Sequence, residues 1–339
     1  MAENVRKLAA ATALTVVLLA LGGTVLADDQ VTIETVPIGH ANNEDNAWGD
    51  GYGGVDYEFR VGKYEVTAGQ YTAFLNAVAV TDTYGLYSTM MDSFLGCKIQ
   101  RDGESGSYSY SVPADYVNRP VNYVSWADAA RFANWLHNGQ FTGEQDLTTT
   151  EDGAYYLNGA TSNEDVIAVT READWTWAIT SEDEWVKAAY YDPATESYFE
   201  YPTSSNSIPG LDTTETTNPG NNANYYLGGS FSPILPPYWR TEAGEFELSS
   251  SPYGTFDQAG NLTEWTELVL YETMRQIRGG SFATRIGTLH VSNRGNADYP
   301  TNDNYGFGFR VSHIPEPASL ALLAFGTVTM LTRRRNPRG

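Results

Sequence analysis

The side chains that could carry out chemistry are few in kind: one thiol, a handful of imidazoles and many carboxylates. Cys97 is the only cysteine, so an internal disulfide, a dithiol redox pair and a cysteine-rich zinc site are excluded. The four histidines are scattered without the short spacings of metal ligands: His40, His137, His290 and His313. We therefore expect neither dithiol chemistry nor a histidine-based metal centre.

Carboxylates are the abundant ionisable groups. The chain has 42 Asp and Glu against 20 Lys and Arg, which gives a formal net charge of −22. A field of this sign repels nucleic-acid phosphates and anionic lipids, and it attracts cations such as Ca²⁺. We expect no nucleic-acid partner, whereas the choice between cation binding and solubility alone stays open.

Residues 1–27 have the layout of a secretory signal peptide. Arg6 and Lys7 form a basic start, residues 8–21 are mostly apolar and uncharged, and Ala27 ends a small-residue cleavage site. The apolar run is short for a retained membrane anchor. We therefore expect the chain to be handled by the export machinery.

The last residues, 313–339, resemble a PEP-CTERM sorting signal. A Pro315–Pro317 box is followed by a largely apolar run over residues 319–332 and by the basic cluster Arg333–Arg335. The basic cluster resists translocation, and the run is short for a permanent span, which fits transient anchoring. The resemblance implies processing by an exosortase-type transpeptidase in a Gram-negative envelope, with exopolysaccharide as a possible matrix partner. We expect a cell-envelope or extracellular location.

One helix-start signal occurs three times between the two terminal segments and predicts three helices. In each one a Ser or Thr is followed three residues later by Gln, Asp or Glu, and then by apolar residues at helical spacing. The hydroxyl oxygen accepts a free backbone N–H at the helix start, and each such cap contributes about 1 kcal/mol. The three boxes are Thr67–Gln70, Ser125–Asp128 and Ser181–Glu184.

The rest of the chain is predicted to consist of short strands and long loops. Two stretches rich in Asn, Gly, Ser, Thr and acidic residues, Phe141–Asp174 and Thr195–Glu242, predict surface loops of a length that is often functional. The strand-like segments are Val31–Ile38, Tyr57–Tyr64, Gln276–Phe282 and Gly306–Ser312.

Five short phrases follow one another along the middle of the chain. They are Tyr64–Phe74, Arg119–Ala129, Ser181–Ala189, Asp257–Trp265, and Arg278–Phe282 followed by Gly308–Arg310. In this order and spacing they resemble the formylglycine-generating enzyme family, also called the sulfatase-modifying factor domain. The resemblance covers roughly Thr32 to Ser312 and implies an α+β, C-type-lectin-like fold with few helices, short strands and long loops. We expect one such domain over residues 28–312.

Active members of this family oxidise a sulfatase cysteine to formylglycine with copper and oxygen, through two cysteines that follow Gly-Gly-Ser. In this chain the matching positions are Thr284 and Leu289, whereas the serine itself is kept as Ser281. Neither threonine nor leucine binds Cu(I), which selects soft thiolates, and Cys97 alone does not replace a pair. We therefore expect neither copper nor formylglycine-generating activity.

The charged neighbours of Ser281 allow two interpretations. Arg285 and Arg294 follow it and could form a surviving anion or ligand site. Alternatively Ser281 bonds to the backbone and the arginines pair with some of the many carboxylates. We favour the second, structural interpretation.

The resemblance also implies calcium. The family holds one Ca²⁺ with alternating side-chain and carbonyl oxygens, and hard oxygen ligands of this kind suit the ion. A second family site would begin at Asn224, although its later ligands do not align. The alternative is a turn followed by a buried glutamate. The positions that match the first site are Asp257 and Glu264 as carboxylates and Gly260 and Leu262 as carbonyls.

These observations favour an exported module that binds a ligand or has a structural role without catalysis. Aromatic loops such as Tyr198–Tyr201 and Tyr225-Tyr226 could stack on sugar rings. The alternative is an oxidoreductase of the same family with altered chemistry. Iron-dependent relatives place histidine ligands in a separate helical domain, which this sequence lacks.

Overall fold

The fold is taken from a computed structural model that describes residues 30–49, 51–228, 234 and 236–315. The chain divides at Gln30, and everything below concerns the unit that begins at Val31. The predicted signal peptide and nearly all of the predicted sorting tail lie outside the described residues. Within those residues, no helix combines the length and the apolar character that a membrane span needs.

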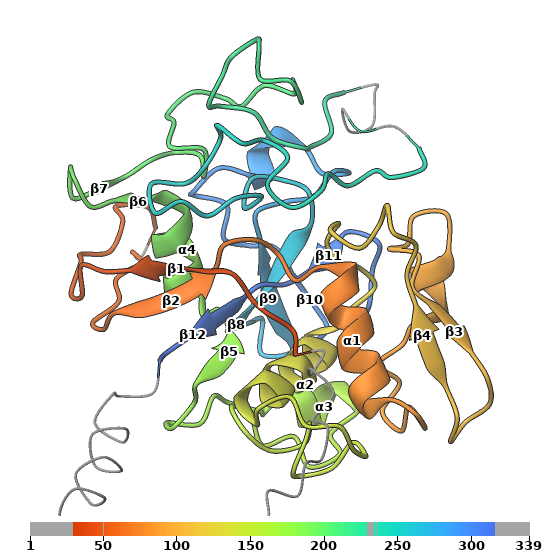
Figure 1. The fold of residues 1–339 in the computed structure, drawn as a ribbon. Helices are drawn as coiled ribbons and strands as arrows, with labels where there is room; N and C mark the ends of the chain where they lie inside the picture. The colour runs from red at the N-terminus through yellow and green to blue at the C-terminus, as the bar shows by residue number, and fades with distance from the viewer. Residues whose placement is uncertain (1–29, 50, 229–233, 235, 316–339) are drawn as a thin grey trace, which may run out of the picture. The chain divides into compact units, whose positions relative to one another are not determined.

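One antiparallel sheet joins the two ends of this unit. Its strand order is β1-β2-β12-β5, with bounds Thr35–Ile38, Phe59–Gly62, Val311–His313 and Trp177–Ile179. Val61 of β2 stands opposite Ser312 of β12, so the second and the last strand of the domain are neighbours. Figure 1 shows this sheet beside α4, with β12 running out toward the C-terminal end.

A second sheet carries the phrases that end the family resemblance. Its order is β10-β9-β8-β11, with bounds Ala297–Asp298, Met274–Arg278, Thr263–Leu270 and Phe307–Gly308. The β8–β9 hairpin is antiparallel with Glu264 opposite Arg278, whereas β11 runs parallel to β8. The segment that follows β9 therefore begins next to β8, at the position of Glu264.

The three predicted helices begin at their predicted caps. They are α1 (Ala68–Val78), α2 (Trp126–His137) and α4 (Glu182–Tyr190), and each shows both hydrogen bonds of a capping box. Their apolar stripes are core, as expected. Phe74 of α1 and Phe132 of α2 meet edge to face at 5.3 Å between ring centroids, and both are fully buried.

The predicted loop Phe141–Asp174 contains a helix that the sequence analysis missed. This helix, α3 (Asn163–Ile167), has only five residues, and Ser162 accepts the N–H of Asp165 at its start. A helix of little more than one turn has no room for an apolar stripe, so periodicity cannot reveal it.

Small hairpins and 3₁₀ turns complete the regular structure of the described residues. The hairpins are β3 (Gln100–Asp102) with β4 (Ser109–Ser111) and β6 (Tyr191–Asp192) with β7 (Ser197–Tyr198), and the turns are η1 (Thr89–Asp92) and η2 (Ile286–Thr288). The few helices and short strands make the domain α+β.

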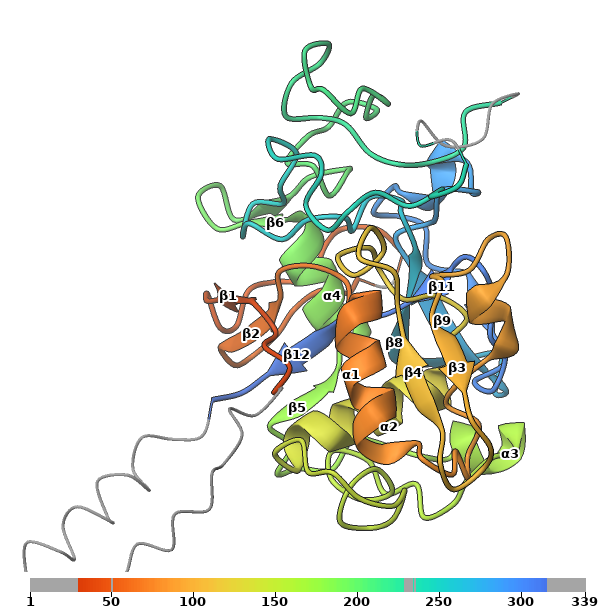
Figure 2. The same ribbon diagram turned by 45° about the vertical axis from the view of Figure 1, so that its right-hand side comes forward.

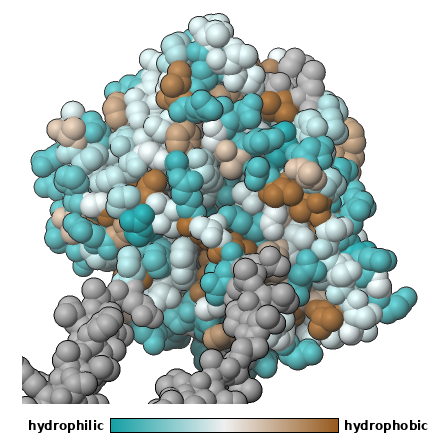
Figure 3. Space-filling view, in the orientation of Figure 1, coloured by the Kyte–Doolittle hydropathy of each residue, from teal (hydrophilic) through white to brown (hydrophobic). Residues whose placement is uncertain are grey.

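The two predicted long loops lie at opposite ends of the domain, and the first, Phe141–Asp174, lies with α2 and α3. Both views show the green and teal chain of residues 195–260 on the side away from α2 and α3, next to the short helix η2 (Figures 1 and 2). The face drawn in Figure 3 is mostly hydrophilic, with hydrophobic residues in separate small patches.

Candidate functional site

A tight turn after β9 builds the segment where the family resemblance implies chemistry. Gly279 and Gly280 adopt positive φ values of 86° and 72°, which favour glycine. A Cβ on Gly280 would lie 2.2 Å from Thr288 Oγ1 and 2.7 Å from Thr284 Oγ1. The glycine pair therefore lets the two threonine hydroxyls close over the backbone.

The two positions that match the family cysteines have different surroundings. Thr284 Oγ1 accepts the N–H of Ser281 at 2.7 Å and lies 2.8 Å from Thr288 Oγ1. Leu289 is fully buried in a cluster with Tyr201 and Tyr225. One position thus presents a hydroxyl, whereas the other is part of the hydrophobic core.

A pocket of about 420 Å³ opens beside Thr284. None of the described residues that line it carries a thiol, carboxylate, imidazole, ammonium or guanidinium group. Its polar groups are hydroxyls and amides, and its only ionisable side chain is the phenol of Tyr305. The lining residues are Thr263, Ile277, Ser281, Ala283, Thr284, Thr288, Gly295, Asn296, Ala297, Asn304, Tyr305, Gly306 and Phe307.

Of the retained serine and the two arginines, only Ser281 lines this pocket. Ser281 lines the pocket, and its hydroxyl accepts the N–H of Ala283 at 3.3 Å. Arg294 forms a salt bridge with Glu182 at 2.8 Å, as the structural interpretation predicted. Arg285 is exposed, and neither arginine lines this pocket.

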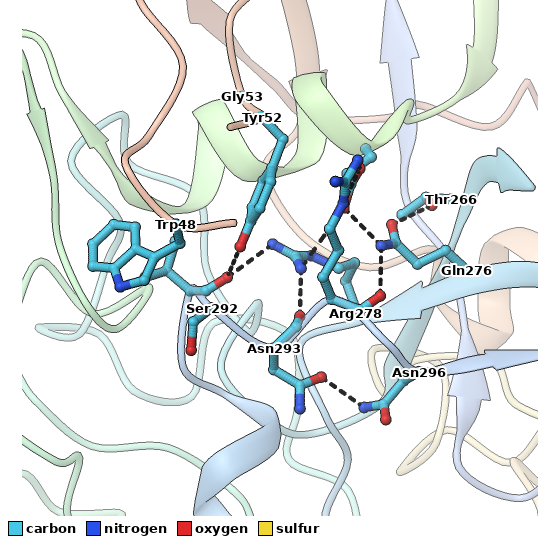
Figure 4. Close-up of polar contacts among 12 residues, drawn as sticks. Trp48, Tyr52, Gly53, Thr266, Gln276, Arg278, Ser292, Asn293 and Asn296 are labelled. Carbon is cyan, nitrogen blue, oxygen red and sulfur yellow. Dashed lines mark hydrogen bonds and ion pairs between the residues drawn. The ribbon is translucent and has the colours of Figure 1, made fainter. Parts of the chain in front are cut away.

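Hydrogen bonds from Arg278, the last residue of β9, support one wall of the pocket. The Arg278 guanidinium donates to the carbonyl of Asn293 and, at 3.3 Å, to that of Val291. The hydroxyl of Tyr52 donates to the same Val291 carbonyl at 2.7 Å. The Asn296 amide, in the pocket wall, then donates to Asn293 Oδ1 at 2.9 Å. Figure 4 shows Arg278 and, beside it, the Asn293–Asn296 contact, so hydrogen bonds tie this wall of the pocket to β9.

Sequence reasoning missed most of the pocket's polar residues. Asn296, Asn304 and Tyr305 come from two loops, one after η2 and one before β11. A weak signal existed for the second loop, because Asn304 and Tyr305 directly precede the Gly308–Arg310 phrase. In the aromatic loops that we did single out, Tyr201 and Tyr225 are buried, whereas Tyr198 and Tyr226 are half-buried.

The residues predicted to bind calcium are brought together but are engaged in other contacts. Both oxygens of Glu264 lie 2.6 Å from the Arg310 guanidinium, and one of them also accepts Trp185 Nε1 at 2.7 Å. Asp257 accepts the N–H of Gly244 at 2.7 Å, and burial raises the pKa of this carboxyl to about 6. Two of the predicted ligands are therefore acids with protein partners, Glu264 buried and Asp257 partly buried.

A third acid joins this group. Glu65 accepts the N–H of Leu262 at 3.0 Å and the Asn261 amide at 2.7 Å. Desolvation, followed by the charges of Glu264 and Asp257, raises the pKa of Glu65 well above its usual range. Arg310 is the only cation with a salt bridge to any of the three acids in the described chain.

The predicted ligand Asn224 is part of the same packing. Its backbone carbonyl accepts the N–H of Asn261, and its amide donates to Trp239 O at 3.0 Å. Gly260 passes so close that a Cβ there would lie 2.1 Å from Asn224 O. In the described part of the chain, no set of three or more His, Cys, Asp or Glu could hold a metal by side chains alone. A calcium ion here would thus need the carbonyls of Gly260 and Leu262, as the resemblance implies.

Comparison with known proteins gives one family. The model of the sulfatase-modifying factor enzyme 1-like domain matches residues 17–313. No curated protein matches the sequence. The structure of CarF is similar, with 20% identity, a TM-score of 0.53 and coverage of 83% of this chain and 98% of that chain.

Two further solved structures have lower scores. Variable protein 1 of Treponema denticola has 17% identity, a TM-score of 0.48 and coverage of 84% and 98%. PvdO from Pseudomonas aeruginosa has 18% identity, a TM-score of 0.46 and coverage of 83% and 91%. At these identities a structural likeness concerns the fold and not the activity.

Proposed function

The chain belongs to the sulfatase-modifying factor enzyme 1-like domain family, and from this premise we propose that it is a non-catalytic member that binds a neutral, hydroxyl-rich ligand. The fold is the predicted α+β, C-type-lectin-like one. A shared fold does not transfer an activity, so the proposal rests on the pocket itself.

The observation that carries the proposal is the chemistry of the pocket at Ser281 and Thr284. Hydroxyls and amides line this pocket, and one of them, on Thr284, stands where the family resemblance implies a thiol. Such groups donate and accept hydrogen bonds without charge, which complements the hydroxyls of a saccharide. The ring of Tyr305 is 38% exposed at the rim and offers a face for stacking. An uncharged lining supports a neutral ligand over an anionic one.

The same lining gives no support to the alternative of an altered oxidoreductase. Redox chemistry in a protein needs thiolates, metal ligands or a bound cofactor to carry electrons. Among the described lining residues, none carries a thiol, thioether, imidazole or carboxylate group that could bind a soft metal or act as a general base. The binding interpretation is therefore the one that we develop.

We further propose that the chain is exported and sorted through its two ends. The support is sequence alone: the signal-peptide layout of residues 1–27 and the PEP-CTERM resemblance of residues 313–339. A neutral-saccharide pocket would suit an exopolysaccharide matrix. Deletion of Pro315–Pro317 should leave the tail unprocessed in a host with an exosortase, and normal processing of that variant would contradict the sorting proposal.

We also propose a calcium site, with ligands from Asp257, Gly260, Leu262 and Glu264. Its support is a surplus of negative charge, because only Glu264 of the three neighbouring acids has a salt bridge among the described residues, whereas Glu65 and Asp257 have none. An uncompensated buried carboxylate is costly, and a bound cation would offset that cost. Arg310 already contacts Glu264, so Ca²⁺ would have to share that carboxylate.

The binding proposal is tested with the chain from residue 28 to 315, which contains the whole described unit from Val31. It is screened on a glycan array of neutral and anionic saccharides, and hits are titrated by calorimetry. Tyr305→Ala should weaken binding at least about fivefold, because it removes the rim ring. The matched control is Tyr299→Ala, since Tyr299 is 40% exposed and does not line the pocket. Absence of neutral-saccharide binding, or an effect of Tyr299→Ala equal to that of Tyr305→Ala, would overturn the proposal.

A further inference from the structure

The first of the two predicted long loops, Phe141–Asp174, builds a groove beside α2 and α3. The groove consists of two adjoining pockets of about 740 Å³ and about 480 Å³, and Tyr156 and Glu172 line both of them. His137, the last residue of α2, lines the smaller pocket. None of the residues that line the groove also lines the pocket at Thr284, so the two sites are separate.

The ionisable groups of this groove are mainly acidic, and we call it the acidic groove. No lysine or arginine lines it in the described part of the chain, and its one imidazole, that of His137, accepts the N–H of Thr176 at 3.1 Å. Its five carboxylates have no salt bridge among the described residues. They belong to Asp152, Glu164, Asp165, Glu172 and Asp174.

The arginines of the neighbouring segments point into the interior. Arg171 directly precedes Glu172, yet its two Nη atoms donate to Glu184 at 2.7 and 3.0 Å. Arg131 pairs with Glu151 at 2.6 Å, and both side chains are 1% exposed. These cations therefore neutralise interior acids and leave the carboxylates of the acidic groove uncompensated.

Backbone hydrogen bonds fix the walls of the groove. The N–H of Leu157 donates to Glu151 O at 2.8 Å, and the N–H of Gly159 donates to Glu151 Oε2 at 2.8 Å. The N–H of Glu172 donates to Ala154 O at 2.9 Å, which ties the second wall to the first. A site that is already ordered loses little entropy when a ligand binds.

Two apolar side chains remain in contact with solvent inside the groove. Tyr156, which lines both pockets, is 51% exposed, and Leu147 in the smaller pocket is 49% exposed. An exposed phenol ring among carboxylates offers its face to a cation, and Leu147 offers a contact for the aliphatic part of a long side chain.

We propose that the acidic groove binds a basic peptide segment, with arginine or lysine side chains spaced along an extended chain. Charge complementarity decides the occupant, because five carboxylates line the groove and no ammonium or guanidinium group does. These acids do not converge: in the described part of the chain no three His, Cys, Asp or Glu could hold a metal ion together. Spread carboxylates favour several separated positive charges over one Ca²⁺, and two joined pockets favour an elongated ligand.

The test is fluorescence anisotropy with a labelled peptide of alternating arginine and serine, titrated with the chain from residue 28 to 315. We expect binding that weakens as salt is added. The double variant Glu172→Gln with Asp174→Asn should weaken it about tenfold, because two charge pairs are lost. The matched control is Asp102→Asn with Glu104→Gln, which removes the same charge from exposed acids of the β3–β4 hairpin.

A second pair of variants tests the aromatic contact. Tyr156→Ala should weaken peptide binding about two- to fivefold, as expected for one exposed cation–π contact. Its control is Tyr271→Ala, since Tyr271 is 66% exposed and does not line the groove. Thermal melts verify that all four variants fold.

The outcomes distinguish a groove from diffuse attraction to an acidic surface. Equal weakening by the two double variants would overturn the proposal, because the peptide would then respond to net charge alone. Binding of spermine as tight as that of the peptide would overturn the peptide as occupant. Neutral-saccharide binding at the pocket of Thr284 should be unchanged by Glu172→Gln with Asp174→Asn, so failure of the acidic groove leaves the proposed function standing.

Discussion

Arg310 and Glu264 form an ion pair that is closed to solvent on all sides. The Nε and Nη2 atoms of Arg310 lie 2.6 Å from the two carboxylate oxygens, and both side chains have 0% exposure. Glu264 belongs to the Asp257–Trp265 phrase and Arg310 to the final Gly308–Arg310 phrase. Two of the phrases that reveal the family are therefore joined by a structural contact and not by a catalytic one.

Breaking this pair should be strongly destabilising. Glu264→Gln removes the salt-bridge partner of the buried Arg310 guanidinium, for which we expect a loss of about 3–5 kcal/mol in the free energy of unfolding. The control is Glu34→Gln, which breaks the exposed pair of Glu34 and Lys63 and should cost less than about 1 kcal/mol. Urea unfolding of the three proteins measures both values. A loss for Glu264→Gln as small as that of the control would show that the pair is dispensable.

Calcium should stabilise the domain if the proposed site exists. We expect the melting temperature to fall on addition of EDTA and to recover with Ca²⁺ but not with an equal concentration of Mg²⁺, which demands a stricter octahedral geometry. Asp257→Asn should remove this response. Asp257 has φ of 65°, a conformation that Asn tolerates, so the substitution changes charge and not backbone shape. A melting temperature that ignores both EDTA and Ca²⁺ would refute the calcium proposal.

The local signals in the sequence predicted the helices well, and tertiary contacts explain the misses. The boxes at Thr67, Ser125 and Ser181 are complete within four residues each, so they could be found from the sequence alone. The Glu65–Leu262 hydrogen bond spans 197 residues, and no local pattern announces it. At position 289 the sequence likewise tells us only that a leucine replaces a thiol. That Leu289 belongs to the core follows from its packing with Tyr201 and Tyr225, which are distant in the sequence.

The pocket could be located but not described from the sequence. The Gly-Gly-Ser phrase predicted its position, because Gly279 and Gly280 are needed for the turn. Its uncharged character depends on Asn296, Asn304 and Tyr305, which the fold brings in from loops before and after β10.

The cap of α2 should make stability depend on pH. Burial raises the pKa of Asp128 to about 7, against the opposing effect of its bonds to Ser125. Since the folded state holds this proton more tightly than the unfolded state, its contribution is present at low pH and is lost as pH rises from about 4 through about 7. Unfolding free energies across this range should therefore fall more steeply for the unmodified chain than for Asp128→Asn.

The matched control for this prediction is Asp165→Asn. At the start of α3, the hydroxyl of Ser162 donates to the Asp165 carboxylate at 2.6 Å, just as Ser125 donates to Asp128 in α2. Unlike Asp128, however, Asp165 is exposed. The substitution should leave the pH profile unchanged. If Asp128→Asn and the unmodified chain have parallel profiles, the buried cap is not the titrating group.

The single thiol should be inert. Cys97 is fully buried, its Sγ lies 3.9 Å from Asn122 O, and burial raises the pKa of the thiol above its usual value. A protonated, enclosed thiol is neither a nucleophile nor a copper ligand, because both roles require the thiolate. We therefore expect no alkylation of the native chain by iodoacetamide, complete alkylation after denaturation, and no Cu(I)–thiolate absorption on titration with Cu(I).

The Cys97→Ser variant should bind the ligand of the pocket with unchanged affinity, because Cys97 does not line the pocket. Rapid native alkylation together with a copper–thiolate band would mean that the thiol is accessible as a thiolate, and the family's oxidative chemistry would then have to be reconsidered for this chain.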